Sequence, residues 1–244
     1  MRPLTRLGLI AGLATAITGY TRYARPWMLT WGATPAEVSR RLPGDDLIRG
    51  QYVTTHAISV DRPPATVWPW LVQMGYHRGG WYSYDRLEKA VGIGDFADGG
   101  SAQRILPDLQ SLIPGDTVDL SPNGGFTVVG MEPERSLVLR IPMDPLTGGP
   151  ASNSSRVVLD WTWAFVLQPT TQGCRLIIRV RGDLRPHWLA LTFPLLDPIH
   201  LMMERKMLRT IKQRAEASNP GSTAARRSSV EAFADPSREV PAVD

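Results

Sequence analysis

The chain of 244 residues contains a single cysteine, Cys174. One cysteine cannot close an internal disulfide and cannot supply a cysteine-based zinc cluster, so both of these stabilising devices are excluded. An isolated cysteine usually serves as a small apolar side chain of the core. We expect that role for Cys174.

Motifs for nucleophilic catalysis and for phosphate binding are also missing. The sequence has no G-x-S-x-G motif and no glycine-rich phosphate loop at a strand-to-helix turn. The glycines of residues 92–100 (GIGDFADGG) lack the spacing and the preceding strand of a dinucleotide fingerprint. The sequence therefore predicts no cofactor, and whether the protein is an enzyme stays open.

Histidines are few, and they are scattered at His56, His77, His187 and His200. His200 and Glu204 have the i, i+4 spacing of two ligands on one helix face, but no third ligand is evident near them. We therefore predict no metal site.

The formal net charge of +4 comes from the N-terminus alone. Residues 1–30 contain Arg2, Arg6, Arg22 and Arg25 and no acidic residue, so residues 31–244 sum to zero. Binding to nucleic acid needs several basic side chains on one face of a domain. The neutral remainder of the chain argues against such a partner.

The N-terminal segment is uncharged over residues 7–21, between Arg6 and Arg22. As a helix this stretch would cover roughly 22 Å, which is less than the ~30 Å hydrocarbon core of a bilayer. We interpret residues 1–30 as a membrane anchor outside the folded domain, which makes the protein membrane-associated, with a cytoplasmic location as the alternative. A signal peptide and a surface-lying or buried helix also stay open, and the flanking arginines do not set an orientation.

Residues 31–217 have the length and apolar content of one domain. Residues 218–244 are rich in Ser, Ala and Pro, and we expect them to be a disordered tail. Within the domain, alternation and turn signals predict strands at 52–60, 116–121, 126–132, 136–142, 157–168 and 174–182. Helices are expected at 35–42, 64–75, 84–91 and 196–215. This order indicates an α+β fold with an antiparallel sheet.

The strand at 157–168 carries one large aromatic face, with Trp161, Trp163 and Phe165. In the strand at 174–182 the arginines Arg175, Arg179 and Arg181 share the face opposite to the apolar residues, so we expect a sheet with one dry and one wet face. The apolar stripe of the last helix should cover the aromatic face.

Several separated segments resemble one family: PPATVWPWLVQMGY, GGWYSYDRLE, PGDTVDL, TWAFVL and MERKMLRTIKQRAE. Over about residues 27–217 the chain is similar to the actinobacterial branch of the SRPBCC, or START-like polyketide cyclase, superfamily. The resemblance implies a helix-grip fold, in which a curved antiparallel sheet holds a long C-terminal helix beside an apolar cavity. That fold has seven strands where we count six, so one strand is either missing from this interpretation or lies within residues 94–111.

The same resemblance places the stretch GGWYSYDRLE at the mouth of the cavity. Trp81, Tyr82 and Tyr84 would then contact a ligand, although rings in such a loop also serve to anchor helices to a sheet. On the last helix, His200 and Glu204 lie beside Met203 and Met207 and would orient the polar end of a ligand. The simpler alternative is that Asp197 caps this helix and Glu204 forms a structural pair.

The predicted ligand-binding residues are Trp81, Tyr82, Tyr84, Trp161, Trp163, His200, Met203, Glu204 and Met207. The first hypothesis is a membrane-tethered protein that binds an apolar small molecule such as a lipid, polyketide or isoprenoid. The second is a cyclase or dehydratase that uses a tyrosine, His200 or Glu204 as general acid or base. The third is a scaffold with a filled interior. The sequence does not indicate an oligomeric state.

Overall fold

The computed structural model of the chain describes residues 12, 14–90, 92–97 and 99–218. Its helices and strands are, in order, η1 (Tyr20–Ala24, a π-helix), α2 (Arg25–Leu29), α3 (Pro35–Ser39), β1 (Tyr52–Val60), α4 (Pro64–Val72), α5 (Asp85–Ala90), η2 (Pro107–Leu109), β2 (Thr117–Ser121), β3 (Gly124–Glu132), β4 (Ser136–Asp144), β5 (Gly149–Pro150), β6 (Val158–Thr170), β7 (Gly173–Arg185), η3 (His187–Thr192) and α6 (Phe193–Ala217). The predicted tail, from residue 219 on, and residues 1–11 lie outside this range.

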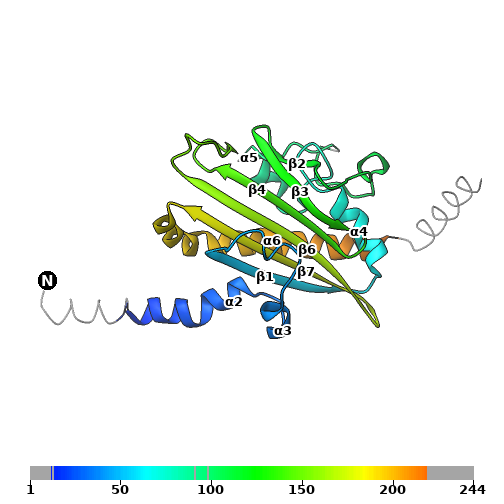
Figure 1. Ribbon diagram of the computed structural model, residues 1–244. Helices are drawn as coiled ribbons and strands as arrows, with labels where there is room; N and C mark the ends of the chain where they lie inside the picture. The colour runs from blue at the N-terminus through cyan, green and yellow to red at the C-terminus, as the bar shows by residue number, and fades with distance from the viewer. Residues whose placement is uncertain (1–11, 13, 91, 98, 219–244) are drawn as a thin grey trace, which may run out of the picture.

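The described strands form one antiparallel sheet in the order β1-β7-β6-β4-β3-β2, with the short β5 paired to β4. The sheet is curved, and the long helix α6 runs across one of its faces while the strands wrap around it (Figure 1). This arrangement confirms the α+β class and the helix-grip architecture.

The strand that sequence analysis missed is β5, at Gly149–Pro150. Of the two alternatives, the position within residues 94–111 was wrong, because the regular structure described there is the single 3₁₀ turn η2. Two residues paired to the end of β4 leave no periodic pattern that a sequence could reveal.

The inner face of the sheet is apolar, as the alternation in β6 predicts. Phe165 is fully buried there, together with Ile178 of β7 and Leu139 of β4. From the helix side, Met207 and Ile211 of α6 complete the same core. Cys174 is also fully buried in this core, as expected.

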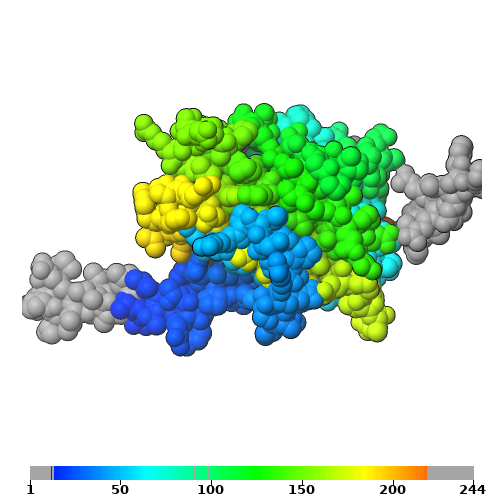
Figure 2. Space-filling model, in the orientation of Figure 1, coloured from blue at the N-terminus to red at the C-terminus, as the bar shows by residue number. Residues whose placement is uncertain are grey.

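The outer face is not wet along its whole length, which corrects the expectation for the arginines of β7. Arg179 is only 4% exposed and donates to Asp45 at 2.9 Å, and Arg175 pairs with Glu37 at 2.7 Å. Both partners belong to the segment between α2 and β1, which lies across the sheet (Figure 2). A buried guanidinium needs such a charged partner. The segment between α2 and β1 therefore supplies the carboxylates that the buried arginines require, and the arginines hold this segment on the sheet.

Residues 31–33, at the start of the predicted domain, cover the free edge of β1. The amide of Ala57 in β1 donates to the carbonyl of Trp31 at 3.2 Å, so the segment covers the edge of this edge strand. Gly32 permits the approach, because a Cβ at this position would lie 2.2 Å from the Ala57 carbonyl oxygen. Its φ of +74° is also a conformation that favours glycine.

Residues 14–29 are helical, and the side chains of residues 14–18 are exposed. In the part of the chain that the structure describes, no helix combines the length and the apolar character needed to cross a bilayer.

Candidate functional site

The inner face of the sheet is less completely buried at the end where β6 begins. Trp161 and Trp163 lie on the inner face of β6 and are partly exposed, whereas Phe165 on the same face is fully buried. Leu189 of η3 is partly buried against the same core. We name this partly exposed region around Trp161, Trp163 and Leu189 the opening.

His200 is the polar residue that α6 presents at this opening. Its side chain is 20% exposed, and its ring meets the ring of Trp161 edge-on at a centroid distance of 5.7 Å. The Tyr52 hydroxyl lies 3.1 Å from Nδ1 of His200. With that hydroxyl donating to Nδ1, a neutral imidazole carries its proton on Nε2.

Glu204 lies one helical turn beyond His200 and is almost completely buried. One of its carboxylate oxygens, Oε2, accepts a hydrogen bond from Nδ1 of His56 on β1, and Nε2 of His56 donates to the Met28 carbonyl at 2.8 Å. Since both nitrogens of His56 face acceptors, the ring is held as an imidazolium. The structure thus contains a buried ion pair between the edge strand and the central helix.

The pKa values of this pair shift toward the charged forms. Burial would lower the pKa of His56, but the Glu204 carboxylate and the two hydrogen bonds raise it above its ordinary value of 6.5. Burial would raise the pKa of Glu204, but His200 and His56 lower it well below its ordinary value. Both groups are consequently charged near pH 6.

The other oxygen of Glu204, Oε1, is buried and has no hydrogen-bond partner among the described residues. Nε2 of His200 lies 3.5 Å away, which is too far for a good hydrogen bond. A hydroxyl group placed between them can accept from the imidazole N–H and donate to the carboxylate. The opening therefore combines an apolar wall with a polar pair suited to an alcohol.

Asp197 has a different role from the predicted helix cap. The cap position of α6 is Thr192, and Asp197 lies within the helix with 1% of its surface exposed. Its Oδ2 accepts from Arg25 at 2.8 Å and from the Tyr20 hydroxyl at 3.1 Å. Asp197 therefore binds the N-terminal helix to α6. This attachment also holds the Met28 carbonyl within hydrogen-bond distance of His56.

The three rings of GGWYSYDRLE point in three directions. Trp81 is 3% exposed and stacks on Trp163 at 5.7 Å, whereas Tyr82 is fully buried and donates to the Trp70 carbonyl at 3.0 Å. Tyr84 is 41% exposed. Only Trp81 reaches the aromatic face next to the opening, and it does so as part of the core.

The two methionines of the predicted set also differ. Met207 is 3% exposed and belongs to the core, while Met203, one turn closer to His200, is partly exposed. The contacts in the structure join Trp161, His200 and Glu204. Trp163 packs instead with Trp81 and Phe126. The remaining predicted residues anchor the core or lie at the surface.

Sequence analysis missed three residues that matter here. Tyr52 and His56 come from β1, where nothing in the local pattern sets them apart from other inward-facing residues.

The third is Glu88 of α5, which is fully buried with neither carboxylate oxygen hydrogen-bonded. Burial, and secondarily the charge of Asp85, raises the pKa of Glu88 to about 7. The signal for Glu88 was its position one turn after Tyr84 on the inward side of a short helix.

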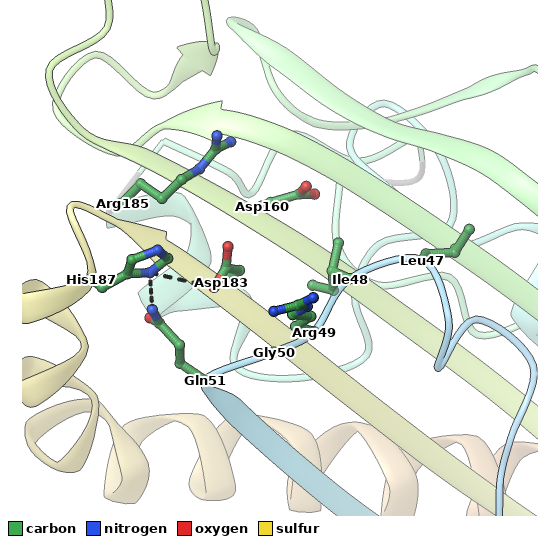
Figure 3. A pocket seen from close by; sticks show the side chains of 9 residues that line it. All are labelled: Leu47, Ile48, Arg49, Gly50, Gln51, Asp160, Asp183, Arg185 and His187. Carbon is green, nitrogen blue, oxygen red and sulfur yellow. Dashed lines mark hydrogen bonds and ion pairs between the residues drawn. The ribbon is translucent and has the colours of Figure 1, made fainter.

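A pocket of about 660 Å³ lies on the outer face of the sheet, away from this opening (Figure 3). Asp160 and Asp183 lie directly opposite each other on β6 and β7, and Arg140 binds Asp160 through two hydrogen bonds. His187 contacts Gln51 and lies 3.9 Å from Asp183. Only part of this charge is paired, and Leu47 and Ile48 add an apolar lining to the pocket.

No group of three or more His, Cys, Asp or Glu side chains in the described ranges is arranged to hold a metal ion.

No family model matches the sequence, and no curated protein matches it. Solved structures do match. The protein MLL2253 from Mesorhizobium loti is 15% identical with a TM-score of 0.41, and the match covers 69% of this chain and 99% of that chain. The protein NE0264 from Nitrosomonas europaea is 13% identical with a TM-score of 0.38, and the match covers 67% of this chain and 94% of that chain. DynU16, a protein of the dynemicin biosynthetic locus, is 16% identical with a TM-score of 0.34, and the match covers 66% of this chain and 47% of that chain. The fold assignment rests on the sheet order and helix described above, and function rests on the site.

Proposed function

We propose that this protein binds an apolar small molecule with a hydroxyl end inside its helix-grip, as a member of the SRPBCC superfamily. The partly exposed rings of Trp161 and Trp163 supply an apolar wall, and the chemical classes that fit are lipids, isoprenoids and polyketides. This proposal keeps the first hypothesis and adds the polar group that the ligand carries.

The observation that carries the proposal is the position of His200. Its imidazole lies at the opening against Trp161 and is held from behind by Tyr52 and Glu204. An unpaired carboxylate oxygen costs free energy in a buried position unless a ligand or water satisfies it. A ligand hydroxyl between His200 and Glu204 would remove that cost and set the ligand's orientation.

Native mass spectrometry of the full chain tests this proposal through a retained small molecule. We expect a discrete bound mass that is lost in His200→Leu and kept in His187→Leu, the matched change at a histidine outside the opening. A bound mass that survives His200→Leu would place the ligand elsewhere. An absence of any bound mass, together with no binding of added long-chain alcohols, would contradict the proposal.

The second part of the proposal is attachment to a membrane. The described part of the N-terminal helix, through Tyr20, adjoins a surface of exposed apolar side chains that we name the apolar face: Trp27, Trp188, Leu191, Leu195, Leu196 and Ile199. Leu191 is 82% exposed and Leu195 is 77% exposed, which is costly in water for neighbouring residues of one helical segment. The Tyr20 hydroxyl donates to the Pro194 carbonyl at 2.7 Å and so holds the N-terminal helix beside this face.

The charge of the N-terminal segment fits an anionic lipid surface. Residues 1–30 carry four arginines and no acid, and Asp197, the nearest carboxylate of α6, is buried against Arg25. Basic residues beside exposed Trp and Leu are typical of segments that lie in the membrane interface. Ile199 adjoins His200, so a ligand dissolved in the bilayer would reach the opening without crossing water.

A second candidate function is acid–base catalysis on a polyketide-like substrate. One observation favours it, namely the series of polar contacts from Tyr52 through His200 to Glu204, which resembles the base-and-orienter pairs of enzymes. Both nitrogens of His200 already face protein groups, which makes binding the simpler function. Conversion of a bound polyketide, followed by mass spectrometry and abolished in His200→Leu, would establish catalysis.

A further inference from the structure

A second hollow, of about 340 Å³, lies between the loop after Trp81 and the helix α6, separate from the interior opening. Tyr82 and Ser83 line it from the loop, Arg86 lines it from the start of α5, and Lys206 and Arg214 line it from α6. The stretch that sequence analysis placed at the mouth of the cavity therefore builds a different site.

The cations of this hollow exceed its anions. Arg86, Lys206 and Arg214 contribute three positive charges, and Asp85 is the one carboxylate among the lining residues. Asp85 is turned toward the loop, where its two oxygens accept from the amide and the hydroxyl of Ser101 at 2.9 and 2.6 Å. Within the described residues no carboxylate lies within ion-pair distance of these three cations, so the hollow has an uncompensated positive charge.

Two hydrogen-bond donors in the hollow are buried and unused. The Ser83 side chain belongs to a residue that is 8% exposed, and its hydroxyl has no partner among the described residues. Nη1 of Arg214 is likewise buried without a partner, while Nη2 donates to the Ser101 carbonyl at 3.1 Å. Buried donors are usually satisfied, so an unpaired hydroxyl beside an unpaired guanidinium nitrogen points to an absent acceptor.

The backbone and the rings fix these donors in place. Tyr82 has a φ of +59°, a left-handed conformation that costs free energy for a tyrosine and turns the chain at this point. The Arg214 guanidinium lies over the Tyr82 ring, 4.8 Å from its centroid, and also faces Trp70 at 5.9 Å. Burial lowers the pKa of Arg214, as expected for a cation without a direct counterion.

We propose that this hollow binds a phosphate group, held by Ser83 and Arg214 from inside and by Arg86 and Lys206 at the rim. A phosphate presents several oxygens at once, so it can accept from a guanidinium, an ammonium and a hydroxyl together. Its charge of nearly −2 near neutral pH matches the net +2 of the lining side chains. This site is independent of the interior opening and of its ligand.

Isothermal titration of the full chain with inorganic phosphate, at constant ionic strength and with acetate as comparison, tests the proposal. We expect a dissociation constant of about 1 mM or below for phosphate. Binding should weaken at least about tenfold in the double variant Arg86→Ala/Lys206→Ala. Arg156→Ala, an exposed arginine in the loop before β6, is the matched control and should leave the affinity unchanged.

Ser83→Ala separates a binding role from a structural one. Because the hydroxyl has no partner, its removal should leave the unfolding midpoint unchanged or slightly higher while weakening phosphate binding at least about fivefold. A lower midpoint with unchanged phosphate affinity would overturn the proposal. So would equal binding of phosphate and acetate, or full affinity in the double variant.

A second titration with vesicles containing phosphatidic acid identifies the source of the phosphate group. Weaker vesicle binding in the double variant assigns the site to a lipid headgroup. Vesicle binding that is unchanged, with inorganic phosphate binding lost, assigns it to a soluble phosphate compound. Either result supports a phosphate site and distinguishes its two sources.

Discussion

The hydroxyl of Tyr52 on β1 lies 3.1 Å from Nδ1 of His200 on α6, and this contact joins the edge strand of the sheet to the helix that the sheet holds. Tyr52 also stacks on Phe193 and Trp161, with centroids at 4.7 and 5.7 Å. His200 is thus fixed on one side by packed rings and on the other by Glu204. A side chain held in this way keeps one orientation toward a ligand, which is what specific recognition requires.

The buried pair of His56 and Glu204 should make a large contribution to stability. Glu204→Gln leaves the imidazolium of His56 without its counterion, and we expect a loss of about 3 to 5 kcal/mol in the free energy of unfolding. Urea denaturation measures this loss. The matched control is Glu132→Gln on the exposed end of β3, whose ion pair with Arg135 should contribute less than about 1 kcal/mol.

The contribution of His56 and Glu204 to stability should depend on pH. The raised pKa of His56 makes its contribution complete below its ordinary value of 6.5 and lost as pH rises through the folded value. The lowered pKa of Glu204 makes its contribution complete above its ordinary value of 4.5 and lost as pH falls through the folded value. The difference in stability between wild type and Glu204→Gln should therefore be greatest between about pH 4.5 and 6.5. A difference independent of pH would contradict the charged pair.

Ionisation of Glu88 should make the folded protein less stable as pH rises. Its pKa is raised from 4.5 to about 7, so folding favours the protonated carboxyl. As pH rises from about 4.5 to 7, the unfolded chain ionises first and the folded state loses stability, by roughly 3 kcal/mol in total. Glu88→Gln stays neutral and should remove this part of the pH dependence. Identical stability profiles for wild type and variant would show that Glu88 is ionised or solvated in the folded protein.

The apolar face should govern how tightly the domain associates with lipid. The substitutions Leu191→Ser, Leu195→Ser and Ile199→Ser each remove roughly 1 kcal/mol or more of the free energy of transfer from water to lipid. Partitioning of the full chain onto vesicles of neutral and anionic lipid should fall at least about tenfold in this triple variant. Leu146→Ser is the control, because Leu146 is 71% exposed in the loop after β4. Equal partitioning of triple variant and wild type would mean that this face does not contact the bilayer.

Local patterns in the sequence predicted the elements well. Alternation placed β1, β6 and β7, and the T-x-x-E spacing of Thr34 and Glu37 forms a capping box at the start of α3, with Thr34 accepting from the Glu37 amide at 3.2 Å. These signals depend on residues that are close in sequence, so a single chain reveals them. The long C-terminal helix was recognised for the same reason, although it begins three residues earlier than expected, at Phe193.

The site itself depends on contacts that no local pattern contains. Arg25 and Asp197 are 172 positions apart, and His56 and Glu204 are 148 apart. A helix-face argument found His200 and Glu204 but could not supply the β1 residues that pair with them. The directions of Trp81, Tyr82 and Tyr84 depend on the left-handed turn at Tyr82, which a sequence without glycine at that position does not predict.

The most direct test of the central claim compares a long-chain alcohol with its methyl ether, by displacement of an apolar fluorophore from the full chain. The alcohol can donate to Glu204 and accept from His200, whereas the ether cannot donate. We predict that wild type binds the alcohol at least about tenfold more tightly, and that His200→Leu removes this preference by lowering the affinity for the alcohol to that of the ether. Equal affinity of wild type for alcohol and ether would contradict the assignment of the His200 and Glu204 pair as the hydroxyl-binding end of the site.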